Sequence, residues 1–175
     1  MTARGAAPHA AKTPRAAAVP AAAADLGREL GTGFTAKLRG SIEVPAGDPN
    51  ASGTAVLRLN AAEGLVCFHL VVTGANAPLV AAHIHQAPAG QAGPVVVPLL
   101  TPAAPAPGSN VQQSKGCVSA DPALISTIKA NPSQFYVNVH NKQFPAGVVR
   151  AQLRPVKEKA IVCTTKKATR KKKGK

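Results

Sequence analysis

Short runs of branched apolar residues, interrupted by turn-forming residues, dominate the chain between residues 34 and 153. Runs of this kind, separated by Gly, Pro, Asn and Asp, are typical of β-strands joined by turns. In residues 54–60, Ala and two Leu alternate with Val and Arg, so one face of that strand is apolar. A four-residue loop, Ala-Ala-Glu-Gly, separates it from residues 65–73, which predicts an antiparallel hairpin. We expect strands at Phe34–Arg39, Thr54–Asn60, Leu65–Thr73, Val80–Gln86, Val95–Leu99, Phe135–Asn141 and Gly147–Leu153.

One segment has helical spacing instead. Leu124, Ile125 and Ile128 recur at intervals that suit one face of a helix, and they follow Asp121-Pro122. An aspartate can cap a helix N-terminus, and proline is favoured at the first helical position, so we expect one short helix, Pro122–Ala130. The chain is therefore expected to be all-β: an antiparallel β-sandwich of about seven strands with one short helix, flanked by disordered tails.

The composition divides the chain into three parts. Residues 1–33 are rich in Ala, Gly and Pro without a sustained apolar period, which predicts a disordered N-terminal segment or a weak targeting sequence. Residues 34–154 form the expected domain, in which the prolines at 102, 105 and 107 predict a surface loop. Residues 155–175 are expected to be a disordered basic tail. No apolar run approaches the roughly 18–20 residues that cross a bilayer, so no transmembrane segment is expected.

The positive charge is concentrated at the C-terminal end. Of a formal net charge of +14, residues 154–175 carry +9, from ten basic side chains and one acidic one. This density predicts non-specific, salt-sensitive contact with anionic partners, which could be nucleic acid, an anionic envelope polymer or membrane headgroups. No aromatic residue is interleaved with the lysines, so the tail offers no stacking platform for nucleic acid bases. The alternative is a tail that is merely solvated.

Two segments hold the candidate metal ligands. His83 and His85 are separated by one residue, so on a strand they share a face. In residues 135–140, Tyr136, Asn138 and His140 line the face opposite to Phe and two Val. Neutral imidazole suits copper and zinc, so the three histidines could converge on either ion. The alternative is that they form ordinary hydrogen bonds to the backbone or to Asn side chains.

Glu43 and Asn138 are candidates for orienting a ligand histidine from outside the metal shell. The alternative for Glu43 is a strand-end position whose partners are limited to Arg39 or Arg150. We expect no catalytic residue, since the chain has neither a Gly-x-Ser-x-Gly elbow nor a phosphate-binding Walker loop.

The chain has three cysteines, at positions 67, 117 and 163, and no Cys-x-x-Cys pair. The simplest interpretation is one disulfide within the domain, Cys67–Cys117, with Cys163 left over. A disulfide requires an oxidising compartment, whereas the alternative is buried free thiols in a reducing one.

Several short segments between residues 34 and 154 together carry a family resemblance. They are Leu38–Gly40, Ile42–Pro45, Gly53–Ala55, Ala82–His85, Gly90–Val97, Asn131-Pro132, Tyr136–His140, Phe144–Gly147 and Arg150–Leu153. Taken in this order, they resemble the chordin (CHRD) domain family, and it is the order that makes the resemblance strong. Ala151 stands where the family usually has Gly.

The resemblance implies an extracytoplasmic β-sandwich and transfers no established catalytic residue. It also implies a cysteine pair like that of some bacterial members, at Cys67 and Cys117. The expected function is a non-enzymatic, secreted or envelope binding or structural module, whose partner is an unidentified protein or an anionic envelope polymer. The second hypothesis is a copper- or zinc-binding protein, with or without redox activity.

Overall fold

The computed structural model describes residues 31–99 and 109–156. The expectations for the N-terminal segment up to residue 30, for the proline-rich loop at residues 100–108, and for the basic tail from residue 157 with Cys163 lie outside the described residues. Within the described part, no helix is long and apolar enough to cross a membrane.

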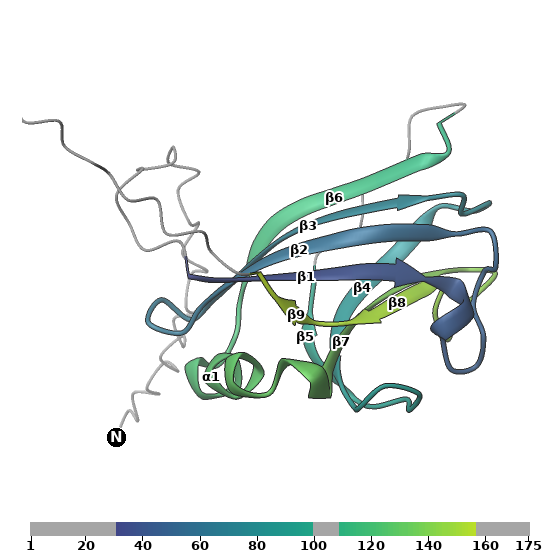
Figure 1. Ribbon diagram of the computed structural model, residues 1–175. Helices are drawn as coiled ribbons and strands as arrows, with labels where there is room; N and C mark the ends of the chain where they lie inside the picture. The colour runs from purple at the N-terminus through teal and green to yellow at the C-terminus, as the bar shows by residue number, and fades with distance from the viewer. Residues whose placement is uncertain (1–30, 100–108, 157–175) are drawn as a thin grey trace, which may run out of the picture.

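Nine strands form one sheet in the order β5-β4-β7-β8-β1-β2-β3-β6, with β9 also paired to β1. All the pairings are antiparallel. The sheet folds over, so that β1, β2, β3 and β6 make one layer and β4, β5 and β7 lie across from them (Figure 1). The strands are β1 (Thr32–Arg39), β2 (Ser52–Asn60), β3 (Leu65–Thr73), β4 (Leu79–Gln86), β5 (Val95–Pro98), β6 (Val111–Ser119), β7 (Phe135–Asn141), β8 (Val149–Gln152) and β9 (Arg154–Pro155). The all-β antiparallel fold is thereby confirmed.

Strand alternation produces a single hydrophobic core. On β2, Ala55, Leu57 and Leu59 are fully buried while Val56 and Arg58 are exposed, as their alternation predicted. The neighbouring β3 points alternate apolar residues to the same side, because directly paired residues in a sheet share a face. Phe and Val side chains of β7 meet them from the other layer.

The predicted helix α1 (Pro122–Ala130) is confirmed. An oxygen of Asp121 accepts a hydrogen bond from the backbone N–H of Ala123 at 2.7 Å, which satisfies a free donor of the first turn. Ile125 and Ile128 are completely buried against the core. Two short 3-10 turns, η1 (Gly40–Ile42) and η2 (Pro132–Gln134), complete the regular structure.

The expected count of seven strands was too low because β6 and β9 were missed. The segment Val111–Ser119 has few large apolar residues, and its one fully inward polar residue, Gln112, is buried. The Gln112 side chain accepts a hydrogen bond from Leu79 N at 2.8 Å and donates one to Ala77 O at 3.0 Å. An edge strand that buries a satisfied amide lacks the apolar alternation by which strands are recognised.

A disulfide joins Cys67 on β3 to Cys117 on β6. The two residues are direct partners in the strand register, with Cα atoms 3.9 Å apart. The missed strand β6 is what brings the second cysteine to the first. The sequence left open a disulfide or two free thiols, and the structure contains the disulfide.

The last described residues pair with the start of the sheet. β9 lies against β1, and Val156 N donates to Gly33 O at 2.9 Å. A truncation that tests the tail alone should therefore keep Val156 and begin at residue 157.

Removing residues 157–175 is expected to leave the midpoint of thermal unfolding unchanged, because this segment is rich in lysine and has few large apolar residues to contribute to a core. It should also lower the salt concentration that elutes the protein from a polyanion column, since most of the net charge is removed. Calorimetry and salt-gradient elution of the two proteins measure both effects. A large drop in the midpoint would instead mean that the tail packs against the domain.

Candidate functional site

His83, His85 and His140 meet on one face of the pair β4–β7. Two residues apart on β4, His83 and His85 point the same way. Across the strand boundary, His83 pairs with Asn138 and Ala81 pairs with His140, which places His140 diagonally from His83. A register shift between residues 79 and 81 of β4 lies beside this diagonal. Antiparallel pairing therefore brings together side chains that are 57 residues apart in sequence.

The three imidazoles are close enough to share one ion. One ligand nitrogen from each ring can be chosen so that all three lie within 4.8 Å of one another. The shortest approach is 3.1 Å, between His83 Nδ1 and His140 Nε2. Two nitrogens bound to one tetrahedral zinc ion at its usual bond length lie about 3.4 Å apart. Since His140 Nε2 is the unprotonated nitrogen, this contact is a hydrogen bond donated by His83 Nδ1. The pair needs little movement to bind the same ion, provided that the His83 proton moves from Nδ1 to Nε2.

Two backbone carbonyls orient the rings. Gly93 O accepts a hydrogen bond from His85 Nδ1 at 2.9 Å, and Pro145 O accepts one from His140 Nδ1 at 3.0 Å. With the proton on Nδ1, the lone pair of each ring is on Nε2, the nitrogen available to a metal. His85 Nε2 is buried and has no hydrogen-bond partner in the structure.

Tyr136 supports this arrangement from β7. Its ring stacks on the His85 ring, with centroids 4.9 Å apart and an angle of 11° between the planes. Its hydroxyl accepts a hydrogen bond from Gly93 N at 3.2 Å. This bond holds Gly93 in place, and the carbonyl of Gly93 orients His85. The guanidinium of Arg150 lies 4.3 Å from the centroid of the Tyr136 ring.

Burial keeps these histidines neutral. Burial, together with the smaller effect of positive charge on His140 and His85, lowers the pKa of His83 to about 4. Burial likewise lowers the pKa of His85 and of His140, although the Gly93 and Pro145 carbonyls oppose the shift. Neutral imidazole is the form that binds a metal, so the cluster is ready to bind at neutral pH.

Glu43 lies just after η1 and is buried, and its contact is with Asn138 and not with a histidine. Asn138 Nδ2 donates to Glu43 Oε1 at 2.8 Å. Burial raises the pKa of Glu43 to about 7, against the opposing influence of Arg150 and of the hydrogen bonds from Val44 and Asn138. Asn138 is the register partner of His83, so Glu43 reaches the histidine strands through one intervening side chain.

Gly147 allows this contact. Its φ is +151°, and a Cβ at this position would collide with the Glu43 carboxylate and the Asn138 amide. Glycine is thus required where the chain turns from β7 into β8.

The two orienting carbonyls could not be identified from the sequence, because a backbone acceptor carries no signature of residue type. The segments that contain them, Gly90–Val97 and Phe144–Gly147, were part of the family resemblance without a role. Tyr136 was placed on the correct face of its strand, but its stacking on His85 depends on the register between β4 and β7.

The comparisons with known proteins gave one match. A family model described as the CHRD domain matches residues 34–153, which is more than half of the chain. Neither the search of curated proteins nor that of solved structures gave a significant match.

Proposed function

The chain belongs to the CHRD domain family, and from this premise we propose that it is a non-enzymatic module that acts outside the cytoplasm and binds one copper or zinc ion. The ligands are His83, His85 and His140. The observation that carries the proposal is the set of three imidazoles whose ligand atoms lie within 4.8 Å of one another.

The chemistry of the donor set supports this assignment. Three histidines on one face leave a further coordination position for water or for a ligand atom from a partner. Hydrogen bonds from Nδ1 to backbone carbonyls are the arrangement by which proteins fix metal-binding imidazoles. An unpartnered, buried Nε2 on His85 costs free energy that coordination would recover.

The disulfide supports a location outside the cytoplasm. Structural disulfides persist in oxidising compartments and are rare in the cytosol. Cys67–Cys117 ties an edge strand to its neighbour and has no role at the histidine cluster, which suits a structural bond.

Titration of the full chain with Zn(II) and with Cu(II) tests the metal site. We expect one equivalent to bind, and we expect His83→Ala/His85→Ala/His140→Ala to weaken binding by at least about 100-fold, because loss of even an orienting partner costs roughly 10–100-fold. Isothermal titration calorimetry with a competing chelator measures both constants.

The controls alter two side chains of types that can bind metal but lie outside the cluster. His69→Ala removes an exposed histidine on the outer face of β3, and Cys163→Ser removes the remaining thiol. Both should bind like the unaltered protein. Equal affinity of the triple variant would eliminate this site, and turnover of a redox substrate by the copper-loaded protein would contradict the non-enzymatic assignment.

A further inference from the structure

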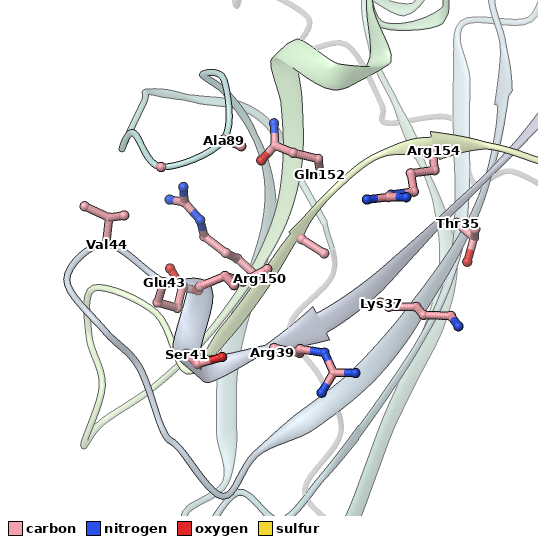
Figure 2. A pocket seen from close by; sticks show the side chains of 13 residues that line it. Thr35, Lys37, Arg39, Ser41, Glu43, Val44, Ala89, Arg150, Gln152 and Arg154 are labelled. Carbon is pink, nitrogen blue, oxygen red and sulfur yellow. The ribbon is translucent and has the colours of Figure 1, made fainter.

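Four cationic side chains, three exposed and one buried, project from the same face of three neighbouring strands. On β1, Lys37 and Arg39 alternate with buried residues and point outward. Arg39 pairs with Arg150 of β8, and Thr35 pairs with Arg154 of β9. The register therefore assembles Lys37, Arg39, Arg150 and Arg154 on one face, although they come from the two ends of the domain (Figure 2).

This face borders a cavity of about 780 Å³. Glu43 is the one acidic residue among the described residues that line it, and burial raises the pKa of Glu43 to about 7. At most one negative charge therefore offsets the four cations. The remaining lining consists of neutral hydrogen-bonding groups and small or branched apolar groups: Thr35, Ser41, Gln152, Ile42, Val44, Ala89, Gly90 and Ala151.

The inner end of the cavity holds polar atoms without partners. Arg150 is 2% exposed, and its guanidinium lies between Val44 and Ala89 (Figure 2). Its Nη2 donates to Gln91 O at 2.9 Å and its Cζ lies over the Tyr136 ring, but Nη1 has no hydrogen-bond partner among the described residues. Glu43 Oε2 is buried without a partner as well. A buried guanidinium nitrogen in this state favours an incoming anion.

We propose that this cavity binds an acidic polysaccharide, a chain of sugars that carry carboxylates. The outer cations pair with carboxylates on successive sugars, and Arg150 takes the one that enters the cavity. The hydroxyl, amide and carboxyl groups of the lining hydrogen-bond to sugar hydroxyls. Ile42 and Val44, both exposed, offer apolar contact to the C–H groups of a sugar ring.

Nucleic acid fits the same surface less well. Binding of single strands relies on aromatic side chains on which bases stack. The described lining contains no aromatic residue, and Tyr136 beneath it is only 2% exposed. None of the three clustered histidines lines the cavity, so the proposed binding of a polysaccharide does not require a bound metal.

The test is calorimetric titration of the full chain with trigalacturonate, a short probe that occupies one site, at physiological salt. We expect Lys37→Gln/Arg39→Gln/Arg154→Gln to weaken binding about tenfold, because three partly screened ion pairs are lost. The three residues are exposed, so the fold should be unchanged, and the circular dichroism spectrum checks this.

Two variants with the same loss of charge serve as controls. Lys171→Gln/Lys172→Gln/Lys173→Gln alters the tail, and Lys115→Gln/Lys129→Gln/Lys142→Gln alters exposed positions on other elements of the domain. Each should change the affinity less than twofold. An equal loss in either control would overturn the proposal, because binding would then follow total charge.

Two further probes test the class of ligand. A glutamate tripeptide has the same number of side-chain carboxylates but no sugar hydroxyls, and we expect it to bind at least about tenfold more weakly. Equal or tighter binding of the peptide, or of a trinucleotide of deoxythymidine, would overturn the assignment to an acidic polysaccharide.

Discussion

Replacing Cys67 and Cys117 with serine is expected to lower the free energy of unfolding by about 4 kcal/mol. The bond closes a segment of 50 residues, and the chain-entropy model assigns that stabilisation to a loop of this length. The two Cα atoms are already register partners in the sheet, so the native pairing does not depend on the bond. Urea unfolding of the oxidised protein and of the double variant measures the difference.

The leftover cysteine provides the control. Cys163→Ser should leave the free energy of unfolding unchanged, because this residue takes no part in the bond. A double variant as stable as the unaltered protein would show that β6 is held by its other contacts alone. Mass spectrometry of the non-reduced protein from its native host should show the Cys67–Cys117 link, and two free thiols there would contradict a location outside the cytoplasm.

The strands that could be predicted are those whose alternation is strong. The bounds of Leu65–Thr73 and Phe135–Asn141 were predicted to the residue, and the helix Pro122–Ala130 was too, because its cap and its proline mark where it begins. β6 was missed because three of its four inward-facing positions are polar or glycine, and the most buried of them is Gln112. A buried amide is stabilised only when its partners are in place, and these partners lie more than 30 residues away.

Of the candidate site, likewise, only the part that depends on local sequence could be predicted. That His83 and His85 share a face follows from the two-residue period of a strand, which the sequence alone supplies. Their approach to His140 needs the pairing of β4 with β7, and the charged face needs the pairing of β1 with β8. Arg39 and Arg150 are direct partners, yet 111 residues separate them in the chain. The register between strands so far apart in the chain is set by burial of one face of the whole sheet, and it cannot be predicted from the sequence of a single strand.

Glu43 should make the stability of the domain depend on pH. Its pKa is raised from 4.5 to about 7, chiefly by burial. Below about pH 4.5 the carboxyl is protonated in both the folded and the unfolded states, so the stability it contributes is fully present. As the pH rises through 7, the unfolded state has already released its proton, and this contribution is lost. The histidines act oppositely, since their lowered pKa values favour the folded state as the pH rises towards 6.5.

Glu43→Gln is therefore expected to stabilise the protein at pH 8 by about 3 kcal/mol and to change little at pH 4.5, since each pKa unit corresponds to about 1.4 kcal/mol. The glutamine oxygen can still accept the hydrogen bond from Asn138. Because both proteins keep the same three histidines, the difference between their free energies of unfolding cancels the histidine contribution. Urea unfolding of both proteins at several pH values from 4.5 to 8 measures it.

Glu63→Gln makes the same chemical change at an exposed carboxylate and serves as the matched control. A difference for Glu43→Gln that is constant with pH would contradict a raised pKa. A difference of the opposite sign at pH 8 would mean that the ionised carboxylate is stabilised by Arg150, the cation whose influence opposes burial. In that case the cavity would present a carboxylate beside its guanidinium, and its attraction for anions would be correspondingly weaker.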